Sequence, residues 1–288
     1  MIDGGYYLIG CVFSFMLGSV ISSFLNVVAW RVPRGESVVS PPSHCPKCSS
    51  PIKWYQNIPI ISYLALRGKC ANCKERISPR YLTVEIVGAL LFLAVFIRLI
   101  SSEMPLATFV IYLIVMWIWV SLMIVGSLID FDHKLLPDFV TVGGMVLGVV
   151  FSAIFTVMNF FPGAPNEELF RKFFPSLFSI SGLCVGFGLL GLVRLLGSMA
   201  FKREAMGMGD VFLMGAVGAI FGPVAAIFTI VASSLFGSIV GVALVALSKT
   251  KFGRYFEIPY GPFICLGCLV WMFAGNEIVQ MYLKLLTP

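Results

Sequence analysis

Long apolar runs separated by short polar segments constrain the fold of this chain more than any other feature. Residues 106–129, for example, read LATFVIYLIVMWIWVSLMIVGSLI without a single charged side chain. About 20 residues of this kind cross the hydrocarbon core of a bilayer as a helix, which bonds its own backbone N–H and C=O groups. Because 59% of the 288 residues are hydrophobic and only 12% are charged, we expect an all-α polytopic membrane protein.

The apolar runs predict about eight transmembrane helices. No basic segment precedes the first run and no small-residue cleavage site follows it, so we expect a retained helix rather than a signal peptide. The sixth run is short and rich in glycine, and only Pro223 separates it from the seventh. The expected helices lie near residues 6–30, 84–100, 106–129, 139–160, 176–199, 209–223, 224–248 and 261–283.

The positions of the 20 Lys and Arg predict the orientation of the helices, because cytoplasmic loops retain positive charge. If the N-terminus lies outside, fifteen of them fall on the inner side and Arg194 lies near the inner end of a helix. The outer side keeps only Arg98, Arg171, Lys172 and Lys284. We therefore expect both termini outside and the long polar loop in the cytoplasm.

That polar loop, residues 31–83, contains two C-x2-C pairs. Cys45 and Cys48 are separated from Cys70 and Cys73 by 21 residues, a pattern that suits four thiolates around one tetrahedral zinc ion. Four Cys leave no open position on the metal, so the zinc would be structural and would fold the loop. The alternative is two redox-active pairs, which the spacing and a reducing cytoplasm disfavour.

Two aspartates at the inner ends of apolar runs indicate a catalytic site. Asp130 ends GSLID and Asp210 ends GMGD, and an Asp beside a membrane span is costly enough to indicate function. Gly207 and Gly209 lack Cβ atoms and let an extended peptide approach Asp210. Two adjacent carboxyl groups share a proton, so one can activate water while the other donates to a carbonyl oxygen. The pair would cleave a peptide bond.

Other readings of these acidic residues stay open. Asp138 follows Pro137 and precedes an apolar helix, so it is either an N-cap or part of the site. Asp132 lies two residues from Asp130, on another side of a helix, which favours a solvated or supporting role. The residue types alone also allow a transporter with Asp130 and Asp210 as proton or cation sites, or an assembly platform whose zinc loop docks partners.

Six segments of the chain, in order, are SSFLNVVAWRVPRG, CPKC, WYQNIPIISYLALRGKCANCKERISPRY, LIDFDHKLLPD, MGMGD and IPYGPF. Together and in this order they resemble the bacterial type IV prepilin peptidases, which are GxGD-type intramembrane aspartyl proteases. The resemblance implies that Asp130 and Asp210 are the catalytic aspartates. It also implies that the leader peptide of prepilins and pseudopilins is cut after a conserved Gly at the cytoplasmic membrane boundary, and that the new N-terminus is methylated from S-adenosylmethionine.

The resemblance nominates only a stretch of the polar loop for methyl transfer. Asn57, Arg67, Gly68 and Glu85 lie in or near it. Glu85 is placed to hold an ammonium nucleophile by charge pairing, and a turn or a helix start is the alternative for each of the four. The segment YFEIPYGPF, residues 255–263, is either a Pro-stiffened entry turn or, by analogy with presenilin-like proteases, a part of the site near Asp210.

These interpretations divide the chain into three parts. We expect a first transmembrane helix (1–30), a cytoplasmic zinc-binding loop domain associated with methyl transfer (31–83) and a transmembrane aspartyl peptidase domain (84–288). The expected cofactors are structural zinc and S-adenosylmethionine as methyl donor. The expected partners are prepilins and pseudopilins as substrates, the lipid bilayer of a bacterial inner membrane with both termini periplasmic, and a second copy of the chain as a candidate homodimer, with no nucleic acid.

Overall fold

The chain forms two compact units, Met1–Leu128 and Ile129–Pro288. Lys249, Lys251 and Arg254, counted above on the inner side, lie outside the described residues. The expected three-part division of the chain stays a prediction. The computed structural model describes residues 4–101, 104–160, 169–204, 206–247 and 258–286.

The first unit is built on helices that meet at small residues. A Cβ on Gly18 of the first helix would lie 2.7 Å from the carbonyl oxygen of Gly88, so glycine lets the two backbones approach as membrane helices often do. The ring of Trp117 stacks on Phe92 at a centroid distance of 5.3 Å, and its Nε1–H donates to the Phe92 carbonyl at 3.1 Å. The long helices are α1 (Gly4–Arg31), α3 (Pro79–Ile100) and, up to residue 128, α4 (Leu106–His133).

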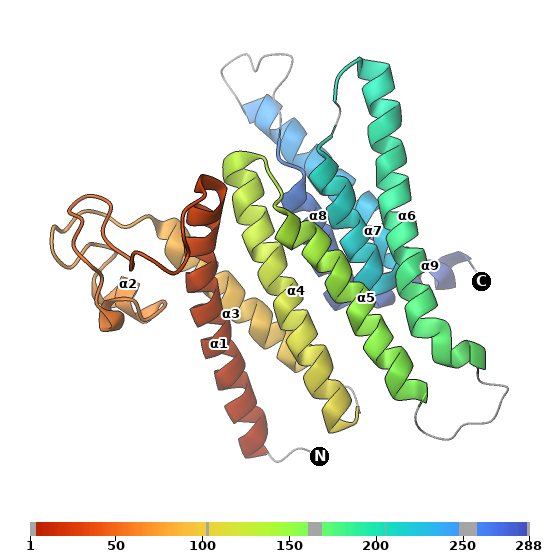
Figure 1. The fold of residues 1–288 in the computed structure, drawn as a ribbon, viewed down its shortest axis with the longest axis horizontal. Coiled ribbons are helices and arrows are strands. Elements are labelled where there is room, and N and C mark those ends of the chain that lie inside the picture. Colours follow the sequence, from red (N-terminus) through yellow and green to blue (C-terminus); the bar gives the residue numbers. More distant parts are fainter. Residues whose placement is uncertain (1–3, 102–103, 161–168, 205, 248–257, 287–288) are drawn as a thin grey trace. The chain divides into compact units, whose positions relative to one another are not determined.

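The polar loop joins α1 to α3 and extends from the helical part of this unit (Figure 1). Helix α3 starts five residues before the expected residue 84, because Ser78 caps it and Pro79 suits its first position. The Ser78 Oγ accepts the N–H of Arg80 at 3.3 Å. Short helices within the loop are η1 (Val32–Arg34), η2 (Trp54–Gln56) and α2 (Ile61–Ala65).

In the second unit, α7 packs against α5, α6 and α8 (Figure 1). Glycines again set the closest approach: a Cβ on Gly182 of α6 or on Gly218 of α7 would overlap the backbone of the other. Ser179 Oγ donates to the Ala219 carbonyl at 2.7 Å across the same interface. The helices are α5 (Asp138–Phe160), α6 (Leu169–Phe201), α7 (Met208–Leu247), α8 (Gly261–Val270) and α9 (Asn276–Leu286).

The expected sixth and seventh spans belong to one helical element, α7. Its backbone leaves the helical region only at Gly222 (φ 85°, ψ −179°), directly before Pro223. Proline cannot continue the hydrogen-bond ladder, and glycine accepts the positive φ. The helix therefore breaks where the sequence predicts a boundary, without a loop between its two arms.

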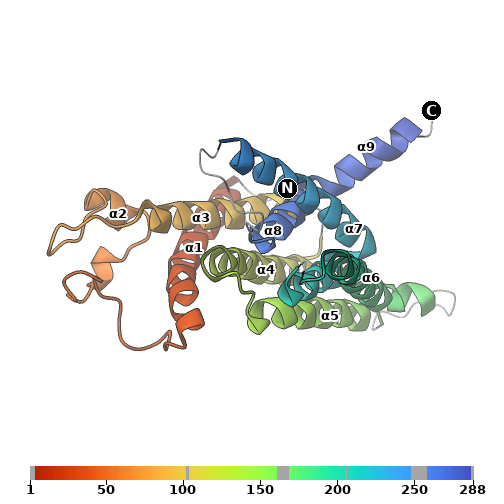
Figure 2. The same cartoon turned by 90° about the horizontal axis from the view of Figure 1, so that it is seen from above.

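The last expected span, residues 261–283, is bent rather than straight. Helix α8 passes through a π-helical turn, η4 (Trp271–Gly275), into α9, and the two parts differ in direction by 71°. Gly275 leaves room for the ring of Trp271 in this turn, and Figure 2 shows α9 pointing away from α8. By length and apolar character the described residues contain six candidate spans, or up to seven if this bent pair is one span.

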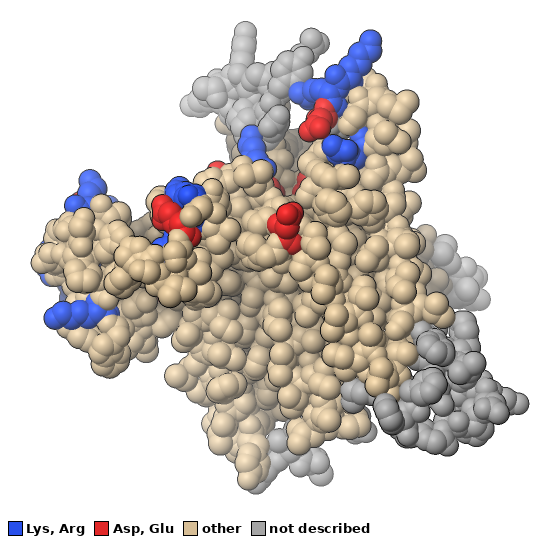
Figure 3. Space-filling model, viewed as in Figure 1, with Lys and Arg blue, Asp and Glu red and all other residues tan. Residues whose placement is uncertain are grey.

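Charged side chains avoid the flanks of the helices. On the face drawn in Figure 3 they gather over the polar loop and around helix ends, and the flanks are uncharged. This distribution is the one expected of helices surrounded by hydrocarbon. The fold is therefore the predicted all-α membrane architecture with a polar loop after the first helix.

Candidate functional site

Asp130 and Asp210 are both buried at helix ends in the second unit. Asp130 lies in the last turn of α4 and is 5% exposed, and Asp210 lies in the first turn of α7 and is 8% exposed. The two carboxyl groups are close enough for their charges to interact. Buried acidic groups of this kind are expensive and mark functional sites in membrane proteins.

Leu136 packs between glycines that adjoin the two aspartates. A Cβ on Gly209, next to Asp210, would lie 2.9 Å from the Leu136 Cβ. A Cβ on Gly261 would lie 3.4 Å from the Leu136 Cδ1 and 2.7 Å from the Asp130 Oδ2. The absence of side chains at both positions leaves the space in which the segment after α4, the start of α7 and the start of α8 meet.

The oxygens of the two carboxyl groups have different surroundings. The N–H of Gly261 donates to Asp130 Oδ2 at 2.9 Å. Asp210 Oδ1 is buried and has no hydrogen-bond partner in the described part of the chain. A Cβ on Gly207 would lie 3.5 Å from Asp210 Oδ2. A buried oxygen without a partner is unusual, and at this position it is available to a water molecule or a substrate group.

For Asp138 the sequence left two roles open, an N-cap and a part of the site. It is the first residue of α5 and is exposed, so it is not buried with the pair. The position before it belongs to Pro137, whose carbonyl accepts the N–H groups of Val140 at 2.9 Å and Thr141 at 3.2 Å. Asp138 therefore contributes its charge to the first turn of the helix, where the dipole favours it, rather than a side-chain cap.

Arg194 fixes the segment that leads into α7. Its Nε donates to the Met206 carbonyl at 2.9 Å, and its guanidinium lies 3.4 Å from the Glu204 carboxylate. The Arg194 side chain is 28% exposed and that of Glu204 is 84% exposed, so the ion pair is solvated and is weak. The bond to Met206 orders the backbone just before Gly207.

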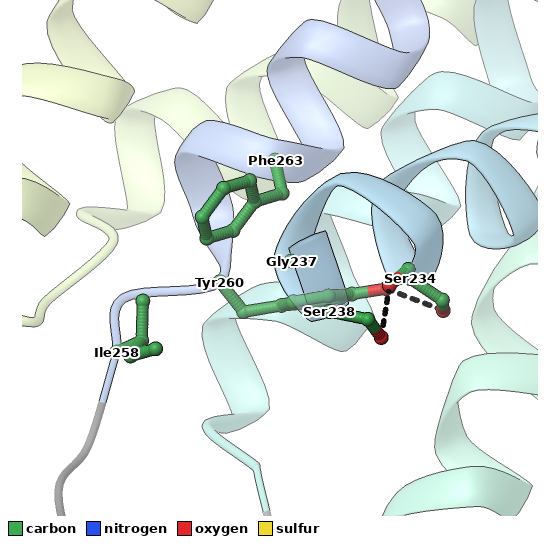
Figure 4. Close-up of a pocket in the computed structure, with 6 residues that line it drawn as sticks. All are labelled: Ser234, Gly237, Ser238, Ile258, Tyr260 and Phe263. Atoms are coloured by element: carbon green, nitrogen blue, oxygen red, sulfur yellow. Dashed lines mark hydrogen bonds between the residues drawn. The ribbon is translucent and has the colours of Figure 1, made fainter. Parts of the chain in front are cut away.

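An open hollow of ≈ 320 Å³ lies beside the start of α8 (Figure 4). Tyr260 crosses it, and its hydroxyl lies 2.6 Å from Ser233 Oγ and 3.3 Å from Ser234 Oγ on α7. The lining residues are Ser234, Gly237, Ser238, Ile258, Tyr260 and Phe263.

The four loop cysteines converge in the first unit. Their sulfur atoms all lie within 4.8 Å of one another, and Cys45 Sγ is 3.8 Å from Cys73 Sγ. A zinc ion with Zn–S bonds of about 2.3 Å at tetrahedral angles separates its sulfurs by about 3.8 Å. The cluster therefore fits four-coordinate zinc. His44 is exposed and its Nδ1 lies 3.3 Å from the Pro42 carbonyl, apart from the cluster.

The two cysteine pairs have the same backbone design. Cys45 N–H donates to the carbonyl of Ser50 at 3.0 Å, and Cys70 N–H donates to that of Glu75 at 2.8 Å. Ser49 and Lys74, the fourth residues after Cys45 and Cys70, both have a positive φ, 56° and 60°. Antiparallel bridges close both turns, joining His44 to Pro51 and Lys69 to Arg76.

Local hydrogen bonds favour the thiolate form that a metal needs. Donation from the side chain and then from the backbone of Ser50 lowers the pKa of Cys48 to about 6. Backbone hydrogen bonds from Cys73 and Asn72 lower the pKa of Cys70. At Cys73 the backbone N–H of Glu75 lowers the pKa, but burial and the neighbouring thiols raise it to about 11. Because metal binding requires deprotonated sulfur, the local hydrogen bonds favour the metal-binding form at Cys48 and Cys70.

The four methyl-transfer candidates lie in the first unit and have different environments. Glu85 is buried in α3, and its Oε2 accepts the N–H of Ile60 at 2.8 Å, which holds Ile60 at a φ of 63°. Gly68 is buried, has a φ of 63°, and has no room for a Cβ beside Tyr63 Oη at 2.9 Å. Asn57 and Arg67 are exposed. In the described part of the chain no hydrogen bond joins these three to Glu85.

Comparison with known proteins identifies the family. Residues 16–99 match the model of the bacterial peptidase A24 N-terminal domain, and residues 117–242 match that of the type IV leader peptidase family. The chain belongs to the type IV leader peptidase family. No solved structure is similar enough to give a match.

Named relatives of this family agree with the match. A prepilin leader peptidase/N-methyltransferase of Myxococcus xanthus is 36% identical over 81% of this chain, which spans 63% of that relative's length. Proteins of the same name from Pseudomonas putida and Pseudomonas aeruginosa are 31% and 32% identical over 94% and 93% of the chain, covering 93% and 92% of their own lengths. Family and names indicate a bifunctional enzyme, a peptidase and N-methyltransferase, in the inner membrane with several spans.

Sequence reasoning within this family left two residues of the candidate site unassigned. Leu136 is an ordinary apolar residue in the sequence, and its position between two glycines depends on helices far apart in the chain. Gly261 was visible only as part of IPYGPF, and its bond to Asp130 joins residues 131 positions apart. One sequence signal could have indicated Gly261: it directly precedes Pro262 at the start of an apolar run.

Proposed function

We propose that this type IV leader peptidase cleaves prepilins and pseudopilins with Asp130 and Asp210 as its catalytic aspartates. The observation that supports the proposal most is the burial of both carboxyl groups at the junction of α4, α7 and α8. Their charges interact, and an oxygen of Asp210 has no partner in the described structure. A pair of carboxyl groups with one shared proton suits hydrolysis of an amide.

In the proposed reaction the pair of carboxyl groups begins and ends each cycle with one proton. The ionised carboxylate takes a proton from water, whose oxygen attacks the peptide carbonyl carbon, while the protonated partner donates to the carbonyl oxygen. Collapse of the tetrahedral intermediate breaks the C–N bond. The amine leaves with a proton from one carboxyl group, and a hydroxyl of the intermediate returns a proton to the other carboxylate, so the pair again holds one proton. The proposed bond follows a conserved Gly of the leader and lies at the cytoplasmic boundary, with both termini of the enzyme periplasmic.

We assign the loop a structural zinc ion and a part in methyl transfer. Cys45, Cys48, Cys70 and Cys73 would hold the zinc, which stabilises the two knuckles and takes no part in a reaction step. S-adenosylmethionine supplies a methyl group on a positively charged sulfur. The exposed guanidinium of Arg67 suits the carboxylate of such a donor, and the buried carboxylate of Glu85 suits the ammonium of a new pilin N-terminus.

The test compares three aspartate variants of the purified enzyme on a prepilin, with and without S-adenosylmethionine. Asp130→Asn and Asp210→Asn should abolish cleavage, because a side-chain amide can neither accept a proton from water nor donate one to the carbonyl oxygen. Asp138→Asn is the matched control, since Asp138 is exposed at a neighbouring helix start, and it should cleave like the parent. Unfolding temperature and zinc content should be equal in all four proteins.

Either amide variant with normal cleavage would remove that residue from the pair. Loss of cleavage in Asp138→Asn with retention in Asp130→Asn would transfer the role to Asp138. Methylation is read separately, on a pilin whose leader has already been removed, so that a failure in cleavage does not hide the second activity.

A further inference from the structure

The first residue of α8 contacts the carboxyl group of Asp130 in two ways. The N–H of Gly261 donates to Asp130 Oδ2 at 2.9 Å in a buried position. A Cβ on Gly261 would lie 2.7 Å from the same oxygen and 3.2 Å from the carboxyl carbon. The first N–H groups of a helix have no partner within it, so this bond also satisfies a buried donor of α8.

Glycine at this position is explained by space and not by backbone conformation. Gly35, Gly68 and Gly222 are the described glycines with a positive φ, and Gly261 is not among them. Any L residue could adopt the backbone here, but its Cβ would push the Asp130 carboxyl group away. The requirement for glycine at 261 therefore concerns the aspartate and not the turn.

The start of α8 is in turn held on α7. The Tyr260 hydroxyl lies 2.6 Å from Ser233 Oγ. It also lies 3.3 Å from Ser234 Oγ (Figure 4). Nearly two turns further along α8, a Cβ on Gly267 would lie 3.1 Å from the Thr229 carbonyl oxygen. These contacts hold the start of α8, and with it Gly261, on the second arm of α7, beyond the break at Gly222.

We propose that Gly261 is a positioning residue for peptide cleavage: its N–H and its missing side chain orient Asp130, and Tyr260 fixes that orientation relative to α7. This inference rests on the proposed role of Asp130. The bond to Oδ2 fixes one carboxyl oxygen of Asp130. A misplacement of about 1 Å costs an enzyme about 100-fold in rate, and the required displacement of the carboxyl group approaches that size.

Gly261→Ala tests the proposal, with Gly188→Ala as the matched control. Gly188 lies within α6, and nothing is within 4 Å of the Cβ that alanine would add. We expect Gly261→Ala to lower kcat for prepilin cleavage by about 100-fold with KM within about twofold of the parent. Gly188→Ala should match the parent in both constants.

The pH dependence of kcat separates positioning from partial unfolding. Moving Asp130 relative to its N–H donor changes the pH at which the pair holds one proton, so the profile of Gly261→Ala should shift. A smaller folded fraction would lower kcat and leave the profile in place. Tyr260→Phe is the second variant, because Ser233 Oγ keeps its bond to the Ile230 carbonyl at 3.1 Å. Its kcat should fall by about tenfold, the effect of about 1.4 kcal/mol, again with KM unchanged.

The outcomes are distinguishable. If Gly261→Ala cleaves at the rate of Gly188→Ala, or loses rate with an unshifted pH profile, the positioning role is overturned even where Asp130→Asn is inactive. If Asp130→Asn itself cleaves normally, the proposed function fails and the role of Gly261 fails with it. If Gly261→Ala does not fold, Tyr260→Phe decides: a kcat and profile equal to those of the parent would overturn the proposal.

Discussion

Replacing Gly148 with alanine should destabilise the second unit, because this glycine lies where α5 meets α7. A Cβ at 148 would lie 2.7 Å from the backbone carbon of Ala219, 2.8 Å from its Cβ and 2.9 Å from Ile220 Cγ1. Ordinary contacts at such a position begin at 3.4 Å. The two helices must therefore separate by 0.7 Å (3.4 minus 2.7) unless one of them shifts along the interface.

The free energy follows from this overlap. Overpacking a close-packed interior costs about 1–3 kcal/mol, and two of the three contacts here are to the Ala219 backbone and Cβ, which cannot rotate away. We therefore expect a loss near the upper end of that range. For a unit of this size each kcal/mol lowers the unfolding temperature by about 2–4 °C. Gly148→Ala should unfold several degrees below the parent.

Gly143→Ala provides the control within the same helix. The nearest atom to its added Cβ is the Asp138 carbonyl oxygen at 4.0 Å, so only helix propensity changes, a gain of up to about 1 kcal/mol. Thermal unfolding in detergent, followed by circular dichroism, measures both variants. Equal unfolding temperatures for Gly148→Ala and Gly143→Ala would refute the packing argument.

Three further predictions concern the loop and the approach to Asp210. A zinc chelator should expose residues 31–83 to protease while the spans stay helical, because structural zinc contributes about 10–16 kcal/mol to folding; Cys45→Ser should do the same, and added zinc should restore protection only in the parent. Arg194→Ala should lower kcat several-fold, since the Met206 carbonyl loses its donor, and Arg194→Lys should recover part of the rate. Glu85→Gln keeps an acceptor for the N–H of Ile60, so cleavage should persist; normal methylation in this variant would exclude a charge-pairing role.

The spans were predictable because a long apolar run in hydrocarbon must bond its own backbone N–H and C=O groups, and a single segment can do so only as a helix. The residues at which the helices begin and end were less predictable. The start of α3 is five residues earlier than expected, because Ser78 and Pro79 extend a helix beyond its apolar part. The two segments on either side of Pro223 join in one element, because Gly222 alone absorbs the break. Such boundaries depend on single capping, glycine and proline residues, which the apolar composition of a segment does not reveal.

The candidate site divides in the same way. The cysteine cluster was predictable, because two C-x2-C pairs at this spacing are typical of a zinc site. In the structure the four sulfur atoms do lie close together. The burial of Asp130 and Asp210 was predictable from the cost of acids near a membrane. Leu136 and Gly261 were not, because their importance arises from contacts between helices that the chain brings together only on folding.

Each aspartate lies beside a helix start, although Asp130 itself is in the last turn of α4, whose dipole disfavours a carboxylate. Asp210 lies in the first turn of α7, and Asp130 accepts the N–H of the first residue of α8. The positive end of a helix favours a carboxylate by about 0.3–1 kcal/mol, and by about 2 kcal/mol where it is partly buried. Burial and mutual repulsion act against charge on both groups. We therefore propose that the pair holds one proton and one negative charge, the state that the proposed hydrolysis requires.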